Sequence, residues 1–327
     1  MRVLITGGAG FIGSHVADAY LAAGHEVGAV DDLSTGSREN VDPRVRFWQV
    51  DIRSPELEQV LAEFQPEIIN HHAAQMSVSV STREPRRDAD INILGTLNLL
   101  EGAVRHKARR VVFASTGGAM YGDQADLPTA ETVFPKPVSP YGVAKLAVER
   151  YLHAYHAMHG LQAIVLRYSN VYGPRQNPHG EAGVVAIFAQ GILGGRELLV
   201  NGDGEQTRDY LFVGDAVHAN LLATQVSLPA AANAAQAGLG EEIAILNIGT
   251  GIEASVNDLI AMFRHIAGGA VSWRHGPPRP GEQRRSALDG ALAKRLLGWA
   301  PTTDLRTGLA RTFRWFEERR EAGRRRG

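Results

Sequence analysis

The feature that most constrains this chain is a glycine-rich turn near its start. Residues 6–13 read TGGAGFIG and directly follow the apolar run 3–5, with Gly7, Gly10 and Gly13 spaced three apart. Glycine lets the backbone approach a ligand closely, and the N-terminus of the following helix offers free N–H groups and a partial positive charge to a pyrophosphate. Since the turn lies between a strand and a helix that includes Phe11 and Ile12, it predicts a dinucleotide-binding site rather than a tight turn without a ligand.

Short β-branched runs alternate with longer helical patterns through the first half of the chain. Such alternation predicts an α/β fold, a doubly wound parallel sheet (Rossmann fold) with helices on both faces. After residue 172 the pattern loosens, which predicts a smaller α/β domain. We expect an NAD-binding domain over 1–172 and a mainly substrate-binding domain over 173–327, with some of its segments free to return to the main sheet. The expected strands are 3–5, 26–30, 45–50, 67–70, 109–114 and 163–167, and the expected helices are 11–23, 55–64, 88–105, 140–159, 256–267 and 304–318.

Acidic residues follow the second and third predicted strands. Asp31 and Asp32 come about 20 residues after the glycines, where a carboxylate binds the 2′-hydroxyl of an adenosine ribose and repels a 2′-phosphate. The position favours NAD over NADP, although both aspartates could instead only cap the turn at 33–36. Asp51 and Ile52 are expected to frame the adenine, the alternative being that Asp51 only begins a helix.

Tyr141 and Lys145 are four residues apart at the start of a predicted helix, so both side chains lie on one face. A neighbouring ammonium, together with a positively charged nicotinamide, favours the phenolate form of a tyrosine. We therefore expect Tyr141 to accept a proton from a substrate hydroxyl while hydride leaves the same carbon, and Lys145 also to bind the nicotinamide ribose. A tyrosine and a lysine at this spacing often occur together by chance. The pair is evidence for catalysis here because it follows a dinucleotide-binding turn in the same chain.

Composition excludes several other functions. The chain has 34 Lys plus Arg and 35 Asp plus Glu, a balance that gives no reason to expect nucleic acid or an anionic membrane as partner. The absence of cysteine excludes disulfides, thiolate catalysis and Cys-ligated zinc.

Two charged or titratable groups of residues are expected to be solvated rather than functional. The arginines at 324–326 are expected to form a frayed, solvated tail. The histidines at 153, 156 and 159 are expected to form a solvated helix face, with no metal site. The start is not typical of a signal peptide, and no apolar run approaches the roughly 18 residues of a membrane helix. We expect a cytoplasmic enzyme.

Further motifs carry a family resemblance. They are His72-Ala73-Ala74, Asn92 within 92–96, Tyr121-Gly122, and the segments 167–173, 202–210 and 279–282. With the glycine turn, Asp31 and the Tyr141–Lys145 pair, the chain resembles the extended short-chain dehydrogenases/reductases over nearly its whole length. Within them it is most similar to the sugar-nucleotide epimerases of the NAD-dependent epimerase/dehydratase family.

The resemblance implies a set of site residues. Asn170 would contact the nucleotide diphosphate or sugar, Arg208 and Arg279 would clamp its phosphates, and Glu282 would lie near the uridine ribose. Ser286 would line the sugar pocket, where a small side chain admits N-acetylhexosamines. The other implied cofactor residues are Thr35, Gly36, Ala73, Ala74, Gln75, Asn92, Ser115 and Tyr168, and the other substrate residues are Thr116, Gly117, Val184, Asn201 and Tyr210.

One position departs from the family pattern. Its members usually carry Ser or Thr four positions before the tyrosine of the Tyr-Gly pair, where this chain has Gly117. We expect Thr116, or a bound water, to hold the substrate hydroxyl instead. The related dehydratases and uronate decarboxylases carry acids after the threonine to protonate a leaving hydroxyl. Here Gly117 and Gly118 stand in those places, so elimination has no obvious catalyst.

The resemblance implies a UDP-hexose 4-epimerase that uses NAD, built as a homodimer through the helices 88–105 and 140–159. Tyr141 would take the C4 hydroxyl proton as hydride passes to NAD, and the 4-keto sugar would turn about its diphosphate linkage before hydride returns to its other face. The alternatives are another sugar-nucleotide epimerase, a one-way reductase, or an NAD- or nucleotide-sensing protein without activity. Gly117 favours the sensor, whereas the intact Tyr141 and Lys145 oppose it.

Overall fold

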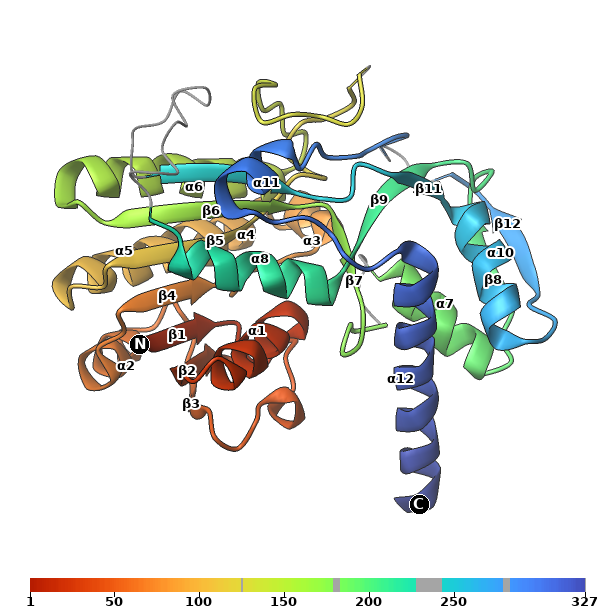
Figure 1. The fold of residues 1–327 in the computed structure, drawn as a ribbon, viewed down its shortest axis with the longest axis horizontal. Coiled ribbons are helices and arrows are strands. Elements are labelled where there is room, and N and C mark those ends of the chain that lie inside the picture. The colour runs from red at the N-terminus through yellow and green to blue at the C-terminus, as the bar shows by residue number, and fades with distance from the viewer. Residues whose placement is uncertain (125, 179–182, 228–242, 279–282, 327) are drawn as a thin grey trace.

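The structure is a computed structural model of the 327-residue chain, and it describes residues 1–124, 126–178, 183–227, 243–278 and 283–326 (Figure 1). Its main sheet has seven strands in the order β10-β6-β5-β4-β1-β2-β3, and every neighbouring pair is parallel. This confirms the predicted doubly wound fold. The strands are β1 (Arg2–Thr6), β2 (Glu26–Asp31), β3 (Arg46–Gln49), β4 (Ile68–His71), β5 (Arg110–Thr116), β6 (Gln162–Tyr168) and β10 (Ile243–Ile248).

Helices cover both faces of this sheet, which is why its central strands read as unbroken apolar runs. Alternate residues of β1 point to opposite faces: Leu4 packs with the helices on one side, and Val3 and Ile5 with those on the other. On the Leu4 side lie α2 (Glu56–Phe64), α5 (Gly95–Arg105) and α6 (Pro140–His159). On the other side lie α1 (Phe11–Ala22) and α8 (Val213–Gln225), which run beside each other in Figure 1.

The predicted helix 88–105 differs from the one observed. Helical backbone begins at Pro85, which occupies a favourable first position, and continues through α4 (Pro85–Ala89), a π-helical turn (η2, Asp90–Leu94) and α5. A shorter helix, α3 (Val78–Arg83), precedes it. Hydrophobic periodicity did not reveal the π turn, which covers only the five residues Asp90–Leu94. The prediction of one uninterrupted helix is therefore corrected.

The remaining elements form a second cluster. β11 (Glu253–Ser255), β9 (Thr207–Phe212) and β7 (Asn170–Tyr172) make a three-stranded sheet, and β8 (Leu198–Asn201) pairs in parallel with β12 (Trp273–Gly276). The rings of Phe188, Phe263 and Phe313 meet between α7 (Val184–Leu193), α10 (Val256–Ala267) and α12 (Leu305–Arg326). The chain also forms a short 3₁₀ turn, η1 (Arg38–Asn40), and α11 (Ala291–Leu297).

The two clusters do not divide cleanly along the sequence. β10 comes from the second half of the chain yet pairs with β6 over Ile243–Ile248, and α11 packs on β10. The boundary at residue 172 therefore stays a prediction. α12 continues to Arg326, so the backbone of the arginine run is helical rather than frayed.

Candidate active site

The candidate site lies where the carboxyl ends of the parallel strands meet. The strand order changes direction between β1 and β4, and a crevice at such a switch point is the usual ligand position in open α/β sheets. The strands there end at Thr6, Asp31, His71, Thr116 and Tyr168. Predicted site residues from distant parts of the sequence are thus brought together at the carboxyl ends of the strands.

The glycine turn is packed so tightly that side chains do not fit. Gly7 has φ +69°, and its N–H donates to the carbonyl of Val30 at 2.7 Å. A Cβ on Gly7 would lie 2.7 Å from the amide nitrogen of Ala73, and one on Gly13 would lie 2.2 Å from the carbonyl oxygen of Gly7. Gly10 is the N-cap of helix α1 and makes no side-chain hydrogen bond there. No capping side chain therefore occupies the helix N-terminus, which begins with Phe11 and Ile12. This cradle fits the diphosphate of a dinucleotide.

Asp31, the last residue of β2, and Asp32, which follows it, both bind backbone N–H groups. Asp31 accepts from Ala9 N at 3.0 Å through Oδ2 and from Leu33 N at 2.8 Å through Oδ1. Burial raises the pKa of the Asp31 carboxyl, although these backbone bonds counteract it. Asp32 is exposed and accepts from the backbone and hydroxyl of Ser34. Asp31 therefore fixes the glycine turn, and its binding to a ribose stays a prediction.

The other predicted adenine-side residues lie nearby. Thr35 is exposed, and a Cβ on Gly36 would lie 3.0 Å from Asp31 Oδ1. Asp51 is held by the guanidinium of Arg53 at 2.6 Å, which lowers the pKa of the Asp51 carboxyl. Ile52 is buried, and its contact with an adenine stays a prediction.

The two histidines at the end of β4 are packed rather than exposed. His71 bonds Thr6 Oγ1 through Nδ1 at 2.6 Å and Thr96 Oγ1 through Nε2 at 2.9 Å. His72 stacks on the ring of Tyr168, whose hydroxyl accepts from Asn220 at 2.7 Å. Burial lowers the pKa of His72 to about 3, and that of His71 well below its usual value. Both rings are therefore neutral and act in packing.

Gln75 and Asn92 form a reciprocal pair beside Asp88. Gln75 N donates to Asn92 Oδ1 at 2.9 Å, and Asn92 Nδ2 donates to the carbonyl of Gln75 at 2.9 Å. Both amides also donate to Oδ1 of Asp88, Gln75 at 2.8 Å and Asn92 at 3.0 Å. Ala73 N donates to Thr6 Oγ1 at 3.2 Å. The segment that contains Ala73 and Ala74 therefore lies beside the end of β1. The three implied cofactor residues Ala73, Gln75 and Asn92 therefore share one hydrogen-bonded region.

The catalytic candidates Tyr141 and Lys145 lie together on α6, capped by Ser139. Lys145 Nζ donates to the carbonyl of Ala114 at 2.9 Å, and it lies 5.8 Å from the centre of the Tyr141 ring and 4.7 Å from that of Phe113. Burial lowers the pKa of Lys145 to about 8.

The protein groups around Tyr141 act against its phenolate form, and the effect of a bound nicotinamide stays a prediction. Burial, and next the carboxylate of Asp88, raise the pKa of the Tyr141 phenol. The ammonium of Lys145 does not reverse this shift. The chain by itself therefore keeps Tyr141 neutral at neutral pH.

Thr116 ends β5, and its Oγ1 accepts from Ala119 N at 3.2 Å. Accepting this bond leaves the hydroxyl hydrogen of Thr116 available for donation. The next residue, Gly117, faces Leu288: a Cβ there would lie 2.3 Å from Leu288 Cδ1. Leu288 therefore fills the space that a side chain at 117 would need, which gives a physical reason for the departure at this position.

Behind this strand end lies a buried ionic network. Glu149 is 0% exposed and binds the guanidinium of Arg167 through both oxygens, at 3.0 and 2.6 Å. Glu149 also accepts from Ser115 Oγ at 2.7 Å, and Arg167 donates to Tyr121 Oη at 2.7 Å. Ser115 is thus engaged inside the protein, and its contact with a cofactor stays a prediction.

The implied substrate residues lie on the second cluster of elements. Asn170 begins β7, Val184 begins α7, Asn201 ends β8, and Arg208 and Tyr210 lie on β9. The three-stranded sheet places Asn170 opposite Tyr210 in the register. Arg279 and Glu282 lie outside the described residues. Ser286 is buried, and its carbonyl accepts from Asp209 N at 2.9 Å.

Three buried charged residues beside the site were not singled out by sequence reasoning: Asp88, Glu149 and Asp209. Glu149 follows Lys145 by four residues, so helical spacing already places it on the face of Tyr141 and Lys145. Asp88 precedes the predicted cofactor residue Asn92 by four residues, so the same spacing could have indicated it. Asp209 carries no comparable signal, because its partners lie 41 or more residues further along the chain.

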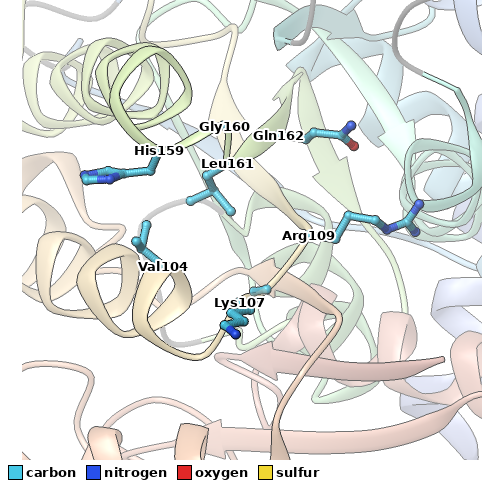
Figure 2. Close-up of a pocket in the computed structure, with 8 residues that line it drawn as sticks. Val104, Lys107, Arg109, His159, Gly160, Leu161 and Gln162 are labelled. Atoms are coloured by element: carbon cyan, nitrogen blue, oxygen red, sulfur yellow. The ribbon is translucent and has the colours of Figure 1, made fainter.

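Among the described residues no group of three or more His, Cys, Asp and Glu side chains could hold a metal ion, and no helix there is long and apolar enough to cross a membrane. A cavity of about 300 Å³ is lined by residues such as Lys107, Arg109 and His159, which Figure 2 draws as sticks. It lies at the start of β5 and β6, the end of these strands opposite Thr116 and Tyr168, so it is not part of the candidate site.

Comparisons with known proteins place the chain in a family. A model of the NAD dependent epimerase/dehydratase family matches residues 3–235, so the chain belongs to that family. The UDP-glucose 4-epimerase of Mycolicibacterium smegmatis is 42% identical over 324 residues, covering 98% of this chain and 99% of that protein.

Two solved structures show the same fold. The UDP-glucose 4-epimerase of Thermotoga maritima with UDP-glucose is 44% identical with a TM-score of 0.90, covering 98% of this chain and 99% of that one. The UDP-glucose 4-epimerase of Thermus thermophilus in complex with NAD is 43% identical with a TM-score of 0.88, covering 97% of this chain and 99% of that one.

Proposed function

We propose that this chain is an NAD-dependent UDP-hexose 4-epimerase that interconverts UDP-glucose and UDP-galactose. The observation that carries the proposal is the meeting of Tyr141 and Lys145 with the end of β5, at the same sheet edge as the glycine turn. Family membership and the likeness to epimerases over almost the whole chain support it.

The proposed NAD site consists of the glycine turn for the diphosphate, Asp31 for the adenosine ribose, and Lys145 for the nicotinamide ribose. The cradle closed by Gly7 and Gly13 leaves room for backbone contact but for no side chain, as a diphosphate needs. When bound, NAD would supply a hydride acceptor that can return the hydride, and a positive charge beside Tyr141.

The chain's own residues would handle the proton. Tyr141 would accept the proton of the C4 hydroxyl and later give it back, and that added positive charge opposes the rise in the pKa of its phenol caused by burial and Asp88. Thr116 would donate a hydrogen bond to the same sugar oxygen, since its Oγ1 already accepts from Ala119 N. Asn170, Val184, Asn201, Arg208, Tyr210, Arg279 and Glu282 are proposed to hold the nucleotide sugar.

The residues after Thr116 favour epimerisation over elimination. Elimination needs an acid to protonate the leaving hydroxyl, and Gly117 and Gly118 have no side chain to supply one. Ser286 is small and lies two residues before Leu288, which contacts Gly117 near the end of β5. We therefore propose that N-acetylated hexoses are also accepted, and that Ser286→Tyr would abolish that activity while sparing UDP-galactose.

The test uses the purified protein with UDP-galactose or UDP-N-acetylgalactosamine, first without added NAD, and separates the C4 epimers by chromatography. Formation of UDP-glucose, and its loss in Tyr141→Phe, is the expected result. No conversion with added NAD would reject the proposal. We also propose a cytoplasmic location, which cell fractionation tests. A role in galactose metabolism is part of the same proposal, and it is tested by whether the gene restores growth on galactose to cells that lack this epimerase.

We also propose a homodimer formed through α6 and the helix from α4 to α5. On α6, Val143, Tyr151 and Met158 are 51%, 39% and 63% exposed, and their spacing places them on one face. Leu94 of the adjoining π turn is 57% exposed. Tyr151→Arg should convert the dimer to a monomer in light scattering, while Ile252→Arg, which changes an exposed residue elsewhere, should not.

A further inference from the structure

Two side chains of helix α6 bind consecutive residues at the end of β5. Lys145 Nζ donates to the carbonyl of Ala114 at 2.9 Å, and Glu149 Oε1 accepts from Ser115 Oγ at 2.7 Å. Lys145, Glu149 and Ser115 are all buried. Because Lys145 and Glu149 lie one helical turn apart on the same face, the two bonds together fix where α6 lies along β5.

The direction of the Ser115 side chain follows from its place in the strand. Val111 and Phe113 of β5 pack in the same apolar cluster as Val148 of α6. Alternate side chains of a strand share a face, so Ser115 continues this row toward α6. Its hydroxyl has one hydrogen, which it donates to Glu149. Toward any other group the hydroxyl can only accept.

Glu149 is itself held in place by Arg167. Both of its carboxylate oxygens accept from the Arg167 guanidinium, at 3.0 and 2.6 Å, and a bidentate pair of this kind has a defined geometry. The same guanidinium donates to Tyr121 Oη at 2.7 Å, and Tyr121 Oη donates to Asn247 Oδ1 at 2.8 Å. One buried ion pair therefore holds Ser115, before the strand end, and Tyr121, after it.

Thr116 lies between these anchored neighbours. Ser115 before it is bound to α6, and Gly117 N after it donates to the carbonyl of Tyr168 at 2.8 Å. Tyr141 lies one helical turn before Lys145 on α6. The position of Thr116 relative to Tyr141 thus depends on the side-chain bonds that join α6 to β5.

We propose that Glu149 is a positioning residue for the reaction: through Ser115 it sets the place of α6 along β5, and with it the distance between Tyr141 and Thr116. The inference rests on the proposed function, because it assigns Glu149 to the same site. It gives Ser115 a role other than the predicted contact with the cofactor. Glu149 is 0% exposed and acts through Ser115.

The test compares Ser115→Ala with the wild type. Alanine removes the bond to Glu149, while Arg167 still pairs with the carboxylate, so no buried charge is left alone. The control is Thr312→Val, which removes a buried hydroxyl that donates to the carbonyl of Gly308 at 2.8 Å within α12. Rates with UDP-galactose give kcat and KM, acid release gives the NAD content, and crystal structures give the distance between Tyr141 Oη and Thr116 Oγ1.

Ser115→Ala should lower kcat at least about tenfold with KM and NAD content nearly unchanged, because misplaced catalytic groups slow the chemical step. The distance between Tyr141 Oη and Thr116 Oγ1 should change by at least about 0.5 Å. Thr312→Val should change none of these quantities. Ser115→Cys, with a weaker donor in the same place, should give an intermediate kcat, and it replaces the alanine variant if that variant does not fold.

Two results would overturn the inference. One is an unchanged kcat or an unchanged distance between Tyr141 and Thr116 in Ser115→Ala. The other is a loss of NAD together with a raised KM, which would assign Ser115 to cofactor binding. The crystal structures need no turnover, so an inactive wild type would reject the proposed function while the positioning by Glu149 is still decided.

Discussion

The side chain of Leu288 lies directly against the backbone of Gly117. A Cβ atom built on Gly117 would stand 2.3 Å from Cδ1 and 2.7 Å from Cδ2 of Leu288. Leu288 is 1% exposed, packs with Met120 and Tyr121, and is itself pressed against Gly249. A residue 171 positions away thus decides which side chain is possible beside Thr116.

Gly117→Ser should therefore destabilise the fold by about 1–3 kcal/mol through overpacking. Gly118→Ser is the matched control, because the nearest atom to its Cβ is Asn170 Oδ1 at 3.7 Å. Urea denaturation measures both variants. Equal stability of the two would show that Leu288 moves aside freely.

Gly13→Ala should impair the cofactor cradle, because the added methyl would lie 2.2 Å from the carbonyl oxygen of Gly7. We expect the NAD content of the purified protein, measured after acid release, to fall at least about tenfold, a change of about 1.4 kcal/mol in binding. Gly269→Ala, at an exposed position whose nearest contact is 3.9 Å, should retain it. Full NAD content in Gly13→Ala would contradict the assignment of the turn.

Arg167→Met should cost about 3–5 kcal/mol of unfolding free energy, because it leaves the carboxylate of Glu149 buried without its cation. Combining it with Glu149→Leu should recover most of that loss. The exposed pair formed by Arg87 and Glu84 provides the comparison, and Arg87→Met there should cost about 0–1 kcal/mol. A similar cost for the two arginines would refute the buried-charge argument.

Lys145→Met should abolish epimerisation yet make the protein more stable at pH 7. Burial lowers the pKa of Lys145 to about 8, so below pH 8 the folded state bears the full cost of a buried ammonium. As pH rises from about 8 toward the pKa of an unfolded lysine, that cost disappears. We expect a gain on the order of 2 kcal/mol at pH 7 that shrinks above pH 8. A gain that does not change with pH would point to packing rather than charge.

Sequence periodicity was sufficient for most of the main sheet and most of its helices, but it predicted neither the edge strand β10 nor helix α8. The helices predicted at 140–159 and 256–267 have those bounds in the structure, because each combines a serine cap, an apolar face and a glycine after its last residue. The helix predicted at 88–105 was less accurate, since neither the earlier start at Pro85 nor the π turn leaves a periodic signal.

By itself the sequence determined the glycine turn, the position of Asp31 and the pairing of Tyr141 with Lys145. These features are local: each depends on spacing within one strand, turn or helix. The tertiary structure alone decided that Leu288 excludes a side chain at Gly117 and that the buried Asp88 accepts from Gln75. It also decided that the pKa of Tyr141 is raised rather than lowered. The reason is that burial and charge depend on which distant segments pack together, and spacing along the chain does not record that.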